Sequence, residues 1–487
     1  MAMETKSCQQ LHIFFLPFMA RGHSIPLTDI AKLFSSHGAR CTIVTTPLNA
    51  PLFSKATQRG EIELVLIKFP SAEAGLPQDC ESADLITTQD MLGKFVKATF
   101  LIEPHFEKIL DEHRPHCLVA DAFFTWATDV AAKFRIPRLY FHGTGFFALC
   151  ASLSVMMYQP HSNLSSDSES FVIPNLPDEI KMTRSQLPVF PDESEFMKML
   201  KASIEIEERS YGVIVNSFYE LEPAYANHYR KVFGRKAWHI GPVSFCNKAI
   251  EDKAERGSIK SSTAEKHECL KWLDSKKPRS VVYVSFGSMV RFADSQLLEI
   301  ATGLEASGQD FIWVVKKEKK EVEEWLPEGF EKRMDGKGLI IRDWAPQVLI
   351  LEHEAIGAFV THCGWNSILE AVSAGVPMIT WPVFGEQFYN EKLVTEIHRI
   401  GVPVGSEKWA FSFVDVNAET EGRVRREAIE EAVTRIMVGD EAVETRSRVK
   451  ELGENARRAV EEGGSSFLDL SALVGELNDL AFGGLVE

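Results

Sequence analysis

The densest set of reactive and hydrogen-bonding side chains in the sequence is H-C-G-W-N-S-I-L-E, residues 362–370. An apolar strand is predicted to end at Thr361, Gly364 permits a tight turn, and a helix is predicted to start near Trp365 to Ser367. The N–H groups at a helix start, together with the helix dipole, attract anions. We therefore expect a diphosphate at this turn, contacted by His362, Asn366 and Ser367.

Glu370 follows Ser367 by three residues and Asn366 by four, so the three side chains share one helix face. A carboxylate in this place can accept hydrogen bonds from ribose hydroxyls. The same spacing also fits a capping box, in which Ser367 and Glu370 satisfy N–H groups at the helix N-terminus. The residues alone leave both interpretations open.

His23 and Asp121 are two further candidates. His23 lies in a predicted loop between the first strand and a helix predicted from Pro26, and Asp121 ends the predicted strand C-L-V-A-D. Functional groups gather at the carboxyl ends of parallel strands, and an imidazole with an ordinary pKa of about 6.5 suits proton abstraction from an alcohol or phenol. Asp121 also fits an N-cap ahead of A-F-F-T-W-A-T-D-V-A, and the two roles are compatible.

Strands and helices must bring these side chains together, and the chain repeats one pattern of elements in two halves. Short apolar runs alternate with helix-patterned stretches, first from the run I-F-F-L-P-F to G-V-I-V-N-S and then from S-V-V-Y-V-S to V-P-M-I-T-W-P. Near-continuous apolar strands separated by helices indicate parallel sheets covered on both faces. We predict an α/β protein with two tandem Rossmann-like domains facing a cleft.

The predicted domain bounds follow from composition. Residues 1–240 form the first domain and the polar segment 241–262 is the linker. Residues 263–465 form the second domain, and a helix over 466–487 is expected to pack back on the first.

The formal net charge of −16 argues against nucleic-acid binding, because such affinity comes mainly from basic residues. Eight scattered cysteines without a C-x-x-C pair fit a reducing compartment. The longest apolar stretches, 13–20 and 146–158, are too short to span a bilayer. We therefore expect a cytoplasmic protein without an integral membrane segment, in the monomeric state.

Residues 344–387 carry a pattern that extends the first motif. This 44-residue run contains W-A-P-Q at its start, then H-C-G-W-N-S, E and G-V-P, and ends in an acidic residue followed by Gln. It resembles the signature box of plant family 1 UDP-dependent glycosyltransferases, which glycosylate small molecules. The segments at 272–288 and 238–249, and the motifs P-F-M-A-R-G-H and V-A-D-A-F-F, are similar to the same family, so the resemblance covers essentially the full chain.

The resemblance implies a GT-B type fold and a role for each matching residue. Trp344 would stack on uracil with Ala345 and Gln347 beside the nucleoside, and Glu370 would hold the ribose hydroxyls. Contacts to the diphosphate would come from Ser288, His362, Asn366 and Ser367. Contacts to the sugar would come from Trp365, Glu386, Gln387 and Thr144. The catalytic base would be His23, with Asp121 as its partner, and Phe123 would belong to the acceptor pocket.

The implied reaction is inverting transfer from a UDP-sugar co-substrate to an oxygen of a hydrophobic plant metabolite such as a flavonoid, terpenoid, saponin or hormone. No cofactor or metal is expected, since the chain contains no D-x-D. Gln387 favours UDP-glucose, because family members that favour galactose tend to have His there. Arg21, next to His23, leaves UDP-glucuronate open as the donor.

Two other functions remain as alternatives. G-T-G-F-F-A, residues 143–148, imitates the G-x-G-x-x-A fingerprint of NAD(P)-dependent oxidoreductases, although it is not in the first β-α unit. A nucleotide-sugar-binding protein without catalysis would keep the donor site, but the presence of both His23 and Asp121 argues against it.

Overall fold

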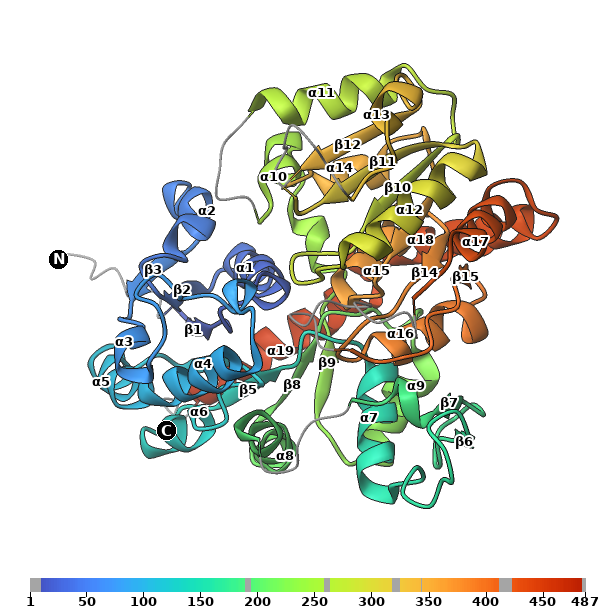
Figure 1. The fold of residues 1–487 in the computed structure, drawn as a ribbon. Helices are drawn as coiled ribbons and strands as arrows, with labels where there is room; N and C mark the ends of the chain where they lie inside the picture. Colours follow the sequence, from blue (N-terminus) through green and yellow to red (C-terminus); the bar gives the residue numbers. More distant parts are fainter. Residues whose placement is uncertain are drawn as a thin grey trace.

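The structure is a computed structural model that describes residues 10–188, 194–257, 263–317, 325–342, 344–410 and 423–483. The described part contains two parallel β-sheets flanked by helices and a small antiparallel hairpin. One sheet is built from the first half of the chain and the other from the second half (Figure 1).

The first sheet has the strand order β3-β2-β1-β4-β5-β8-β9 among the described residues, with all neighbours parallel. Its strands are β1 (His12–Leu16), β2 (Arg40–Thr45), β3 (Glu63–Leu66), β4 (Cys117–Asp121), β5 (Arg138–Phe141), β8 (Gly212–Val215) and β9 (Ala237–His239). The hairpin consists of β6 (Ser170–Val172) and β7 (Lys181–Thr183).

The second sheet has the order β12-β11-β10-β13-β14-β15 and is also parallel throughout its described strands. Its strands are β10 (Val281–Ser285), β11 (Asp310–Val315), β12 (Gly338–Arg342), β13 (Ile356–Thr361), β14 (Met378–Thr380) and β15 (Gly401–Pro403).

Helices surround both sheets (Figure 1). Those of the first half are α1 (Arg21–Ser36), α2 (Ser54–Gln58), α3 (Ser71–Ala74), α4 (Gln89–Leu101), α5 (Glu103–His113), α6 (Ala127–Lys133), α7 (Phe146–Tyr158), α8 (Glu195–Glu208) and α9 (Pro223–Lys231), and α10 (Ile250–Glu255) lies in the predicted linker. Those of the second half are α11 (Thr263–Asp274), α12 (Asp294–Ser307), α13 (Phe330–Arg333), α14 (Gln347–Glu352), α15 (Trp365–Ala374), α16 (Gln387–Lys392), α17 (Arg426–Val438), α18 (Ala442–Val460) and α19 (Ser465–Phe482).

Each sheet has a switch point, where the chain order of neighbouring strands reverses. In the first sheet β1 pairs with β2 and β4, and in the second β10 pairs with β11 and β13. Ligands of open α/β sheets bind outside the carboxyl ends of the strands at this point. His23 follows β1 and Asp121 ends β4, while Ser288 follows β10 and His362 follows β13. The two predicted groups of residues therefore lie at the two switch points.

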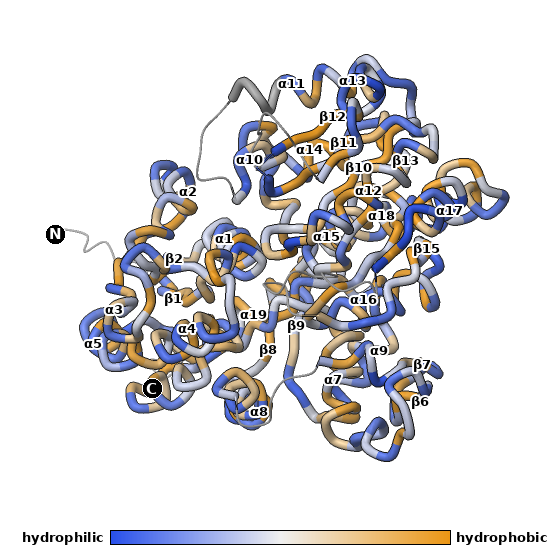
Figure 2. The backbone as a smooth tube through the Cα atoms, in the orientation of Figure 1, coloured by the Kyte–Doolittle hydropathy of each residue, from blue (hydrophilic) through white to orange (hydrophobic). Residues whose placement is uncertain are grey.

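The apolar character of the strands follows from their burial. Every residue of β1, β4, β10 and β13 is buried, as expected for strands covered on both faces. Figure 2 shows hydrophobic residues along the strands of the sheets and hydrophilic residues on the outer helices and turns. The sequence did not indicate β3, β9 and β15: no residue of β3 is buried, β9 is three residues long and ends in His239, and β15 contains Gly401 and Pro403.

The last described helix, α19, returns to the first half of the chain and packs beside β9. Leu470, Leu473 and Leu477 enter the same hydrophobic core as residues of β1, β4 and β5. Asp469 accepts a hydrogen bond from the N–H of His239 at 2.8 Å. The exact domain bounds stay a prediction, and residues 258–262 of the predicted linker and 484–487 of the predicted terminal helix lie outside the described residues.

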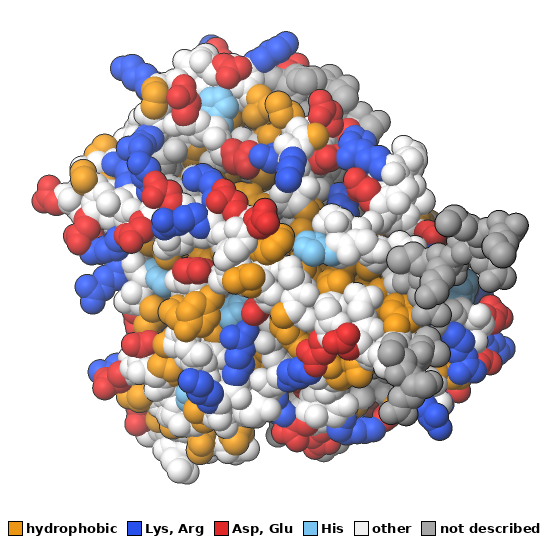
Figure 3. Space-filling model, turned by 180° about the vertical axis from the view of Figure 1, so that it is seen from behind, with side chains coloured by type: hydrophobic (Ala, Val, Ile, Leu, Met, Phe, Trp, Pro, Cys, Tyr) orange, Lys and Arg blue, Asp and Glu red, His pale blue; other side chains and the backbone are white. Residues whose placement is uncertain are grey.

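The surface carries both signs of charge. Figure 3 shows lysine and arginine interspersed with aspartate and glutamate over one face. The seven cysteines in the described ranges are all free. Within those ranges, no helix has the combination of length and apolar composition that crossing a bilayer requires.

Candidate active site

His23 and Asp121 form a hydrogen-bonded pair. Nδ1 of His23 lies 2.7 Å from Oδ2 of Asp121, whose side chain is fully buried. The other carboxylate oxygen accepts a hydrogen bond from the N–H of Phe123 at 3.1 Å. Asp121 is not an N-cap of the next helix, because α6 begins only at Ala127. The pair fixes the imidazole and leaves Nε2 as the ring nitrogen that can take a proton.

His23 lies in the first turn of a helix rather than in a loop, because α1 begins at Arg21 and not at Pro26 as predicted. Proline has no N–H, so the carbonyl of Gly22, four residues earlier, has no donor within the helix. That carbonyl accepts a hydrogen bond from Nδ2 of Asn366 at 2.7 Å. Pro26 thus leaves an acceptor in the first half of the chain for a residue of the second half.

The pKa of His23 is raised above its ordinary value of 6.5. Burial by itself lowers the pKa, because it disfavours the imidazolium. The charge and the hydrogen bond of Asp121 outweigh burial, and the carboxylates of Glu386 and Asp84 act in the same direction. Since Glu386 belongs to the second half, both halves of the chain set the basicity of this imidazole.

Aromatic rings surround the imidazole on the side of the first sheet. The ring of Phe123 lies 5.3 Å from that of His23, and the ring of Phe18 lies 5.6 Å from it. Phe123 also contacts Phe196 of α8, with 5.9 Å between ring centroids. Phe123 therefore lies beside His23, in a wall that an apolar molecule can contact.

Helix α15 begins at Trp365, and its N-cap residue is Gly364. The capping-box interpretation of Ser367 and Glu370 is therefore wrong, because neither residue is at the N-cap. Gly364 has no side chain to accept hydrogen bonds from the first turn, so the N–H groups there remain available to an anion. The expected diphosphate position is consistent with this helix start.

His362 is packed between two glycines. A Cβ atom at Gly287 would lie 2.7 Å from the ring, and one at Gly364 would overlap it. The left-handed residue of the turn is Cys363, with φ of 64°, so Gly364 is needed for the close approach of the ring rather than for the turn. Burial lowers the pKa of His362 to about 4. The ring is neutral at pH 7 and can offer a phosphate a hydrogen bond but no charge.

Glu370 lies at the centre of a buried polar group. Gln347 donates from Nε2 to Oε2 of Glu370 at 2.8 Å and to the hydroxyl of Ser367 at 3.2 Å. Arg256 donates to Oε1 of Glu370. The structure thus brings together three of the predicted nucleoside and phosphate residues, and it adds Arg256, which no motif indicated.

Trp344 lies under the guanidinium of Arg21, whose Cζ is 5.1 Å from the ring centroid, and Ala345 is buried next to it. Arg21 donates its main-chain N–H to Oδ2 of Asp84 at 3.3 Å. Ser288 donates its hydroxyl to Oδ1 of Asp84 at 2.8 Å. Asp84 therefore links the start of α1 to the loop after β10 in the second half, and it was missed because its short turn, Ala83–Leu85, contains no motif.

The residues predicted to contact the sugar differ in how many of their hydrogen-bonding groups are already bonded to other protein atoms. Trp365 donates its indole N–H to the carbonyl of Asn216 at 2.7 Å, so a sugar contact would fall to its main-chain amide. Oε1 of Gln387 accepts from the N–H groups of Val383 and Phe384 at 2.9 and 3.0 Å, which leaves its amide nitrogen as a donor. Burial raises the pKa of Glu386.

Three buried polar atoms of predicted site residues have no hydrogen-bond partner in the described part of the chain. They are Nε1 of Trp344, Nδ1 of His362 and Oγ1 of Thr144. Buried polar atoms in folded proteins nearly always have a partner. These atoms therefore fit a site that a polar ligand completes.

The chain is similar to known proteins of one family. The family of UDP-glucoronosyl and UDP-glucosyl transferases matches residues 3–417. The scopoletin glucosyltransferase of Nicotiana tabacum is 57% identical over 477 residues, which cover 96% of this chain and 98% of that protein. The chain belongs to this UDP-glycosyltransferase family. The anthocyanin 3'-O-beta-glucosyltransferase of Gentiana triflora is 55% identical, with coverage of 96% and 98%.

Solved structures of plant UDP-glycosyltransferases share the fold. A Glycyrrhiza uralensis enzyme complexed with glycyrrhetinic acid 3-O-monoglucuronide superposes with a TM-score of 0.90 at 40% identity, covering 98% of this chain and 97% of that chain. A Medicago truncatula enzyme complexed with UDP-glucose gives a TM-score of 0.79 at 26% identity, with coverage of 96% and 98%. The predicted GT-B type fold is confirmed, and this UDP-glycosyltransferase is an enzyme.

In this UDP-glycosyltransferase, the glycines of the motif G-T-G-F-F-A, residues 143–148, have another role than in a dinucleotide-binding fingerprint. The first amides of α7, at Phe146 and Phe147, donate to the carboxylate of Glu222 at 3.2 and 2.7 Å, so a protein side chain already occupies the anion position. A Cβ atom at Gly145 would lie 2.5 Å from the ring of Trp365. The glycine therefore allows close contact between the two halves of the chain and does not serve a pyrophosphate.

Proposed function

We propose that this chain is an inverting, UDP-glucose-dependent O-glucosyltransferase that acts on a hydrophobic small molecule, with His23 as the general base. The observation that supports this most directly is the 2.7 Å pair of His23 and Asp121 at one switch point, facing the start of α15 at the other. The contact of Asn366 with Gly22 ties the two switch points together.

The proposed chemistry is a single displacement. Nε2 of His23 takes the proton of the acceptor hydroxyl, and the acceptor oxygen attacks the anomeric carbon of the sugar. The bond from that carbon to the diphosphate oxygen breaks, and its electron pair leaves with UDP, so the configuration inverts. Asp121 stabilises the imidazolium, and the helix start with His362 stabilises the charge on the leaving diphosphate. In this scheme no metal is needed.

The choice of donor follows from where the charges lie. Arg21 stacks over Trp344 and contacts Asp84, so its charge is neutralised at the nucleoside end rather than offered to a sugar carboxylate. This supports UDP-glucose over UDP-glucuronate, and Gln387 supports it over UDP-galactose by family resemblance. Initial rates with the three UDP-sugars test the assignment, and a faster rate with galactose or glucuronate would contradict it.

The acceptor class is proposed from the aromatic wall and from the relatives. The rings of Phe18 and Phe123 contact the imidazole of His23, and Phe196 packs on Phe123 and extends the aromatic wall. The related enzymes named above act on scopoletin and an anthocyanin, and an abscisate β-glucosyltransferase of Phaseolus angularis is 49% identical. We propose a phenol, coumarin, flavonoid or terpenoid hydroxyl as acceptor. Mass spectrometry of a panel of such compounds, with release of UDP as a second readout, separates an enzyme from a protein that only binds nucleotide sugars.

The pH dependence of turnover should reveal the effect of Asp121 on the pKa of His23. The neutral imidazole is the active form, so kcat/KM is expected to rise with pH through an apparent pKa above 6.5, because the pKa of His23 is raised. In Asp121→Asn the contributions of the Asp121 charge and its hydrogen bond, the two largest that raise the pKa, are lost while burial remains, so the rise of kcat/KM with pH should move to lower pH as kcat falls. If kcat/KM of this variant rose with pH through the same apparent pKa as in the wild type, Asp121 would not act on His23.

A further inference from the structure

Arg256 lies between two carboxylates from opposite halves of the chain. It follows α10, and its Nε donates to Oδ2 of Asp29 in α1 at 2.7 Å. A terminal N–H of the same guanidinium donates to Oε1 of Glu370 in α15. All three side chains are at least nine-tenths buried. A buried cation in this position is shielded from water and holds its partners firmly.

The hydrogen bonds of Glu370 leave a defined pair of acceptor positions. An ionised carboxylate has about four such positions, two on each oxygen. Arg256 uses one on Oε1, and Gln347 uses one on Oε2 at 2.8 Å. Among the residues that the structure describes, one position on each oxygen remains, and two adjacent acceptors match the two adjacent hydroxyls of a ribose.

The segment that contains Arg256 is fastened to both halves. Ion pairs join α10 to α2 and the residue after it in the first half, and to α14 in the second. They are Arg59 with Asp252 at 2.5 Å, Lys55 with Glu255, and Lys253 with Glu352 at 2.7 Å. Gly257 lies so close to the predicted uracil platform that a Cβ atom there would be 3.0 Å from Trp344. The end of α10 is therefore part of the nucleoside surroundings.

We propose that Arg256 is a positioning residue of the donor site, which orients the Glu370 carboxylate toward both ribose hydroxyls and so makes the enzyme select ribose over 2'-deoxyribose. This rests on the proposed function, in which Glu370 binds the ribose. Asp29 holds the guanidinium from the other side, so the orientation of Glu370 depends on the approach of the two halves of the chain.

Calorimetric titration of the full-length protein with UDP and with dUDP tests this, because neither titration needs the acceptor. Wild-type protein should bind UDP about tenfold more tightly than dUDP, the effect of about one hydrogen bond to a charged group. Arg256→Ala should raise the Kd for UDP about tenfold and bring the ratio of the two Kd values close to one. Arg256→Lys keeps the charge but not the forked geometry, and its ratio should be intermediate.

Lys248→Ala is the matched control, since it removes an exposed cation of the same predicted linker, and it should leave both Kd values unchanged. If both Arg256 variants kept the wild-type ratio of the Kd values for dUDP and UDP, the proposal would be overturned. Tighter UDP binding in Arg256→Ala would also overturn it, because the guanidinium would then compete with the ribose for Glu370. Where thermal unfolding shows that Arg256→Ala is not folded, the Lys variant decides. Failure of the proposed function has a different signature, namely no UDP binding by the wild type or an unchanged UDP affinity in Glu370→Gln.

Discussion

Replacing His23 with alanine is expected to lower kcat on an alcohol acceptor by about 10²- to 10⁴-fold, the contribution of a positioned general base. The loss should fall on kcat rather than on the Kd for UDP, because the predicted nucleotide contacts come from the second half of the chain. Acceptors with more acidic hydroxyl groups should lose less, since their oxygen needs less help to give up its proton. Single-turnover rates with a series of phenols and alcohols measure this dependence.

His37→Ala is a suitable control for that experiment, since His37 lies at the other end of the same helix, α1, directly after its last residue. It should leave kcat within about twofold of wild type, because the half-buried ring of His37 contacts Leu33 and Phe467, which lie away from the site. Turnover close to wild type in His23→Ala on a weakly acidic alcohol would exclude His23 as the base. Equal losses in both variants would point to damage to α1 instead.

The fold and the positions of the main site residues could be predicted because they depend on local patterns. Apolar strand runs identify the sheets, and the residue after a parallel strand lies at its carboxyl end whatever the details of packing. His23 and Asp121 are 98 residues apart, yet both follow from this rule. The same rule places Ser288 and His362 at the second switch point.

The remaining site residues depend on contacts that no local pattern contains. Arg256 and Glu370 are 114 residues apart, and Asp84 and Ser288 are 204 apart. Arg256 and Asp84 lie in polar segments without a motif, so only the approach of the two halves reveals them. Pro26 was misleading for a different reason: proline favours the first turn of a helix, but here the helix begins five residues earlier, at Arg21.

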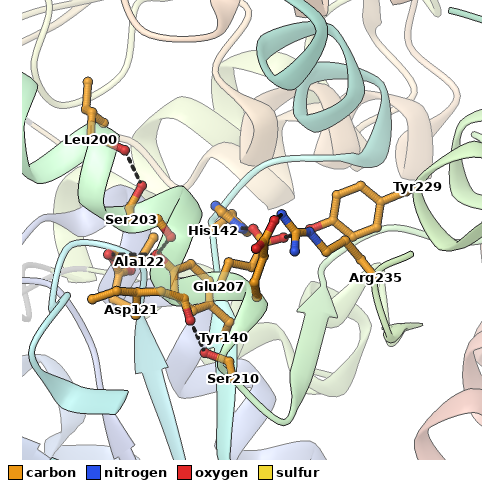
Figure 4. Close-up of polar contacts among 12 residues, drawn as sticks. Asp121, Ala122, Tyr140, His142, Leu200, Ser203, Glu207, Ser210, Tyr229 and Arg235 are labelled. Carbon is orange, nitrogen blue, oxygen red and sulfur yellow. Dashed lines mark hydrogen bonds and ion pairs between the residues drawn. The ribbon is translucent and has the colours of Figure 1, made fainter. Parts of the chain in front are cut away.

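Glu207→Ala is expected to destabilise the protein by about 3–5 kcal/mol, as when one partner of a buried ion pair is removed. Glu207 in α8 accepts from the hydroxyl of Tyr229 at 2.5 Å, pairs with Nε of Arg235 at 3.1 Å, and contacts Nε2 of His142. Figure 4 shows the carboxylate among these three side chains, which come from the end of β5 and from α9 and the segment after it. Its loss leaves buried donors without an acceptor. Chemical denaturation of the full chain measures the change.

The pH dependence of that stabilisation follows from the pKa of Glu207. Burial raises the pKa, but the charge and hydrogen bond of His142, the hydroxyl of Tyr229 and the charge of Arg235 outweigh it, so the pKa lies below the ordinary 4.5. A carboxylate with a lowered pKa stabilises the folded state above its unfolded pKa and loses that effect as pH falls through its folded pKa. The difference between wild type and Glu207→Gln should therefore be full at pH 7 and shrink below about pH 4.5.

Glu208→Gln separates this buried network from ordinary surface charge. Glu208 also pairs with Arg235, at 2.8 Å, but its side chain is 62% exposed, so its loss should cost at most about 1 kcal/mol. Because α8 also carries Phe196 of the aromatic wall, Glu207→Ala should raise the acceptor KM and speed hydrogen exchange in α8 more than in α12. Equal destabilisation by the two substitutions would mean that α8 is held by its apolar contacts, and the buried carboxylate would then have no special part in shaping the acceptor side.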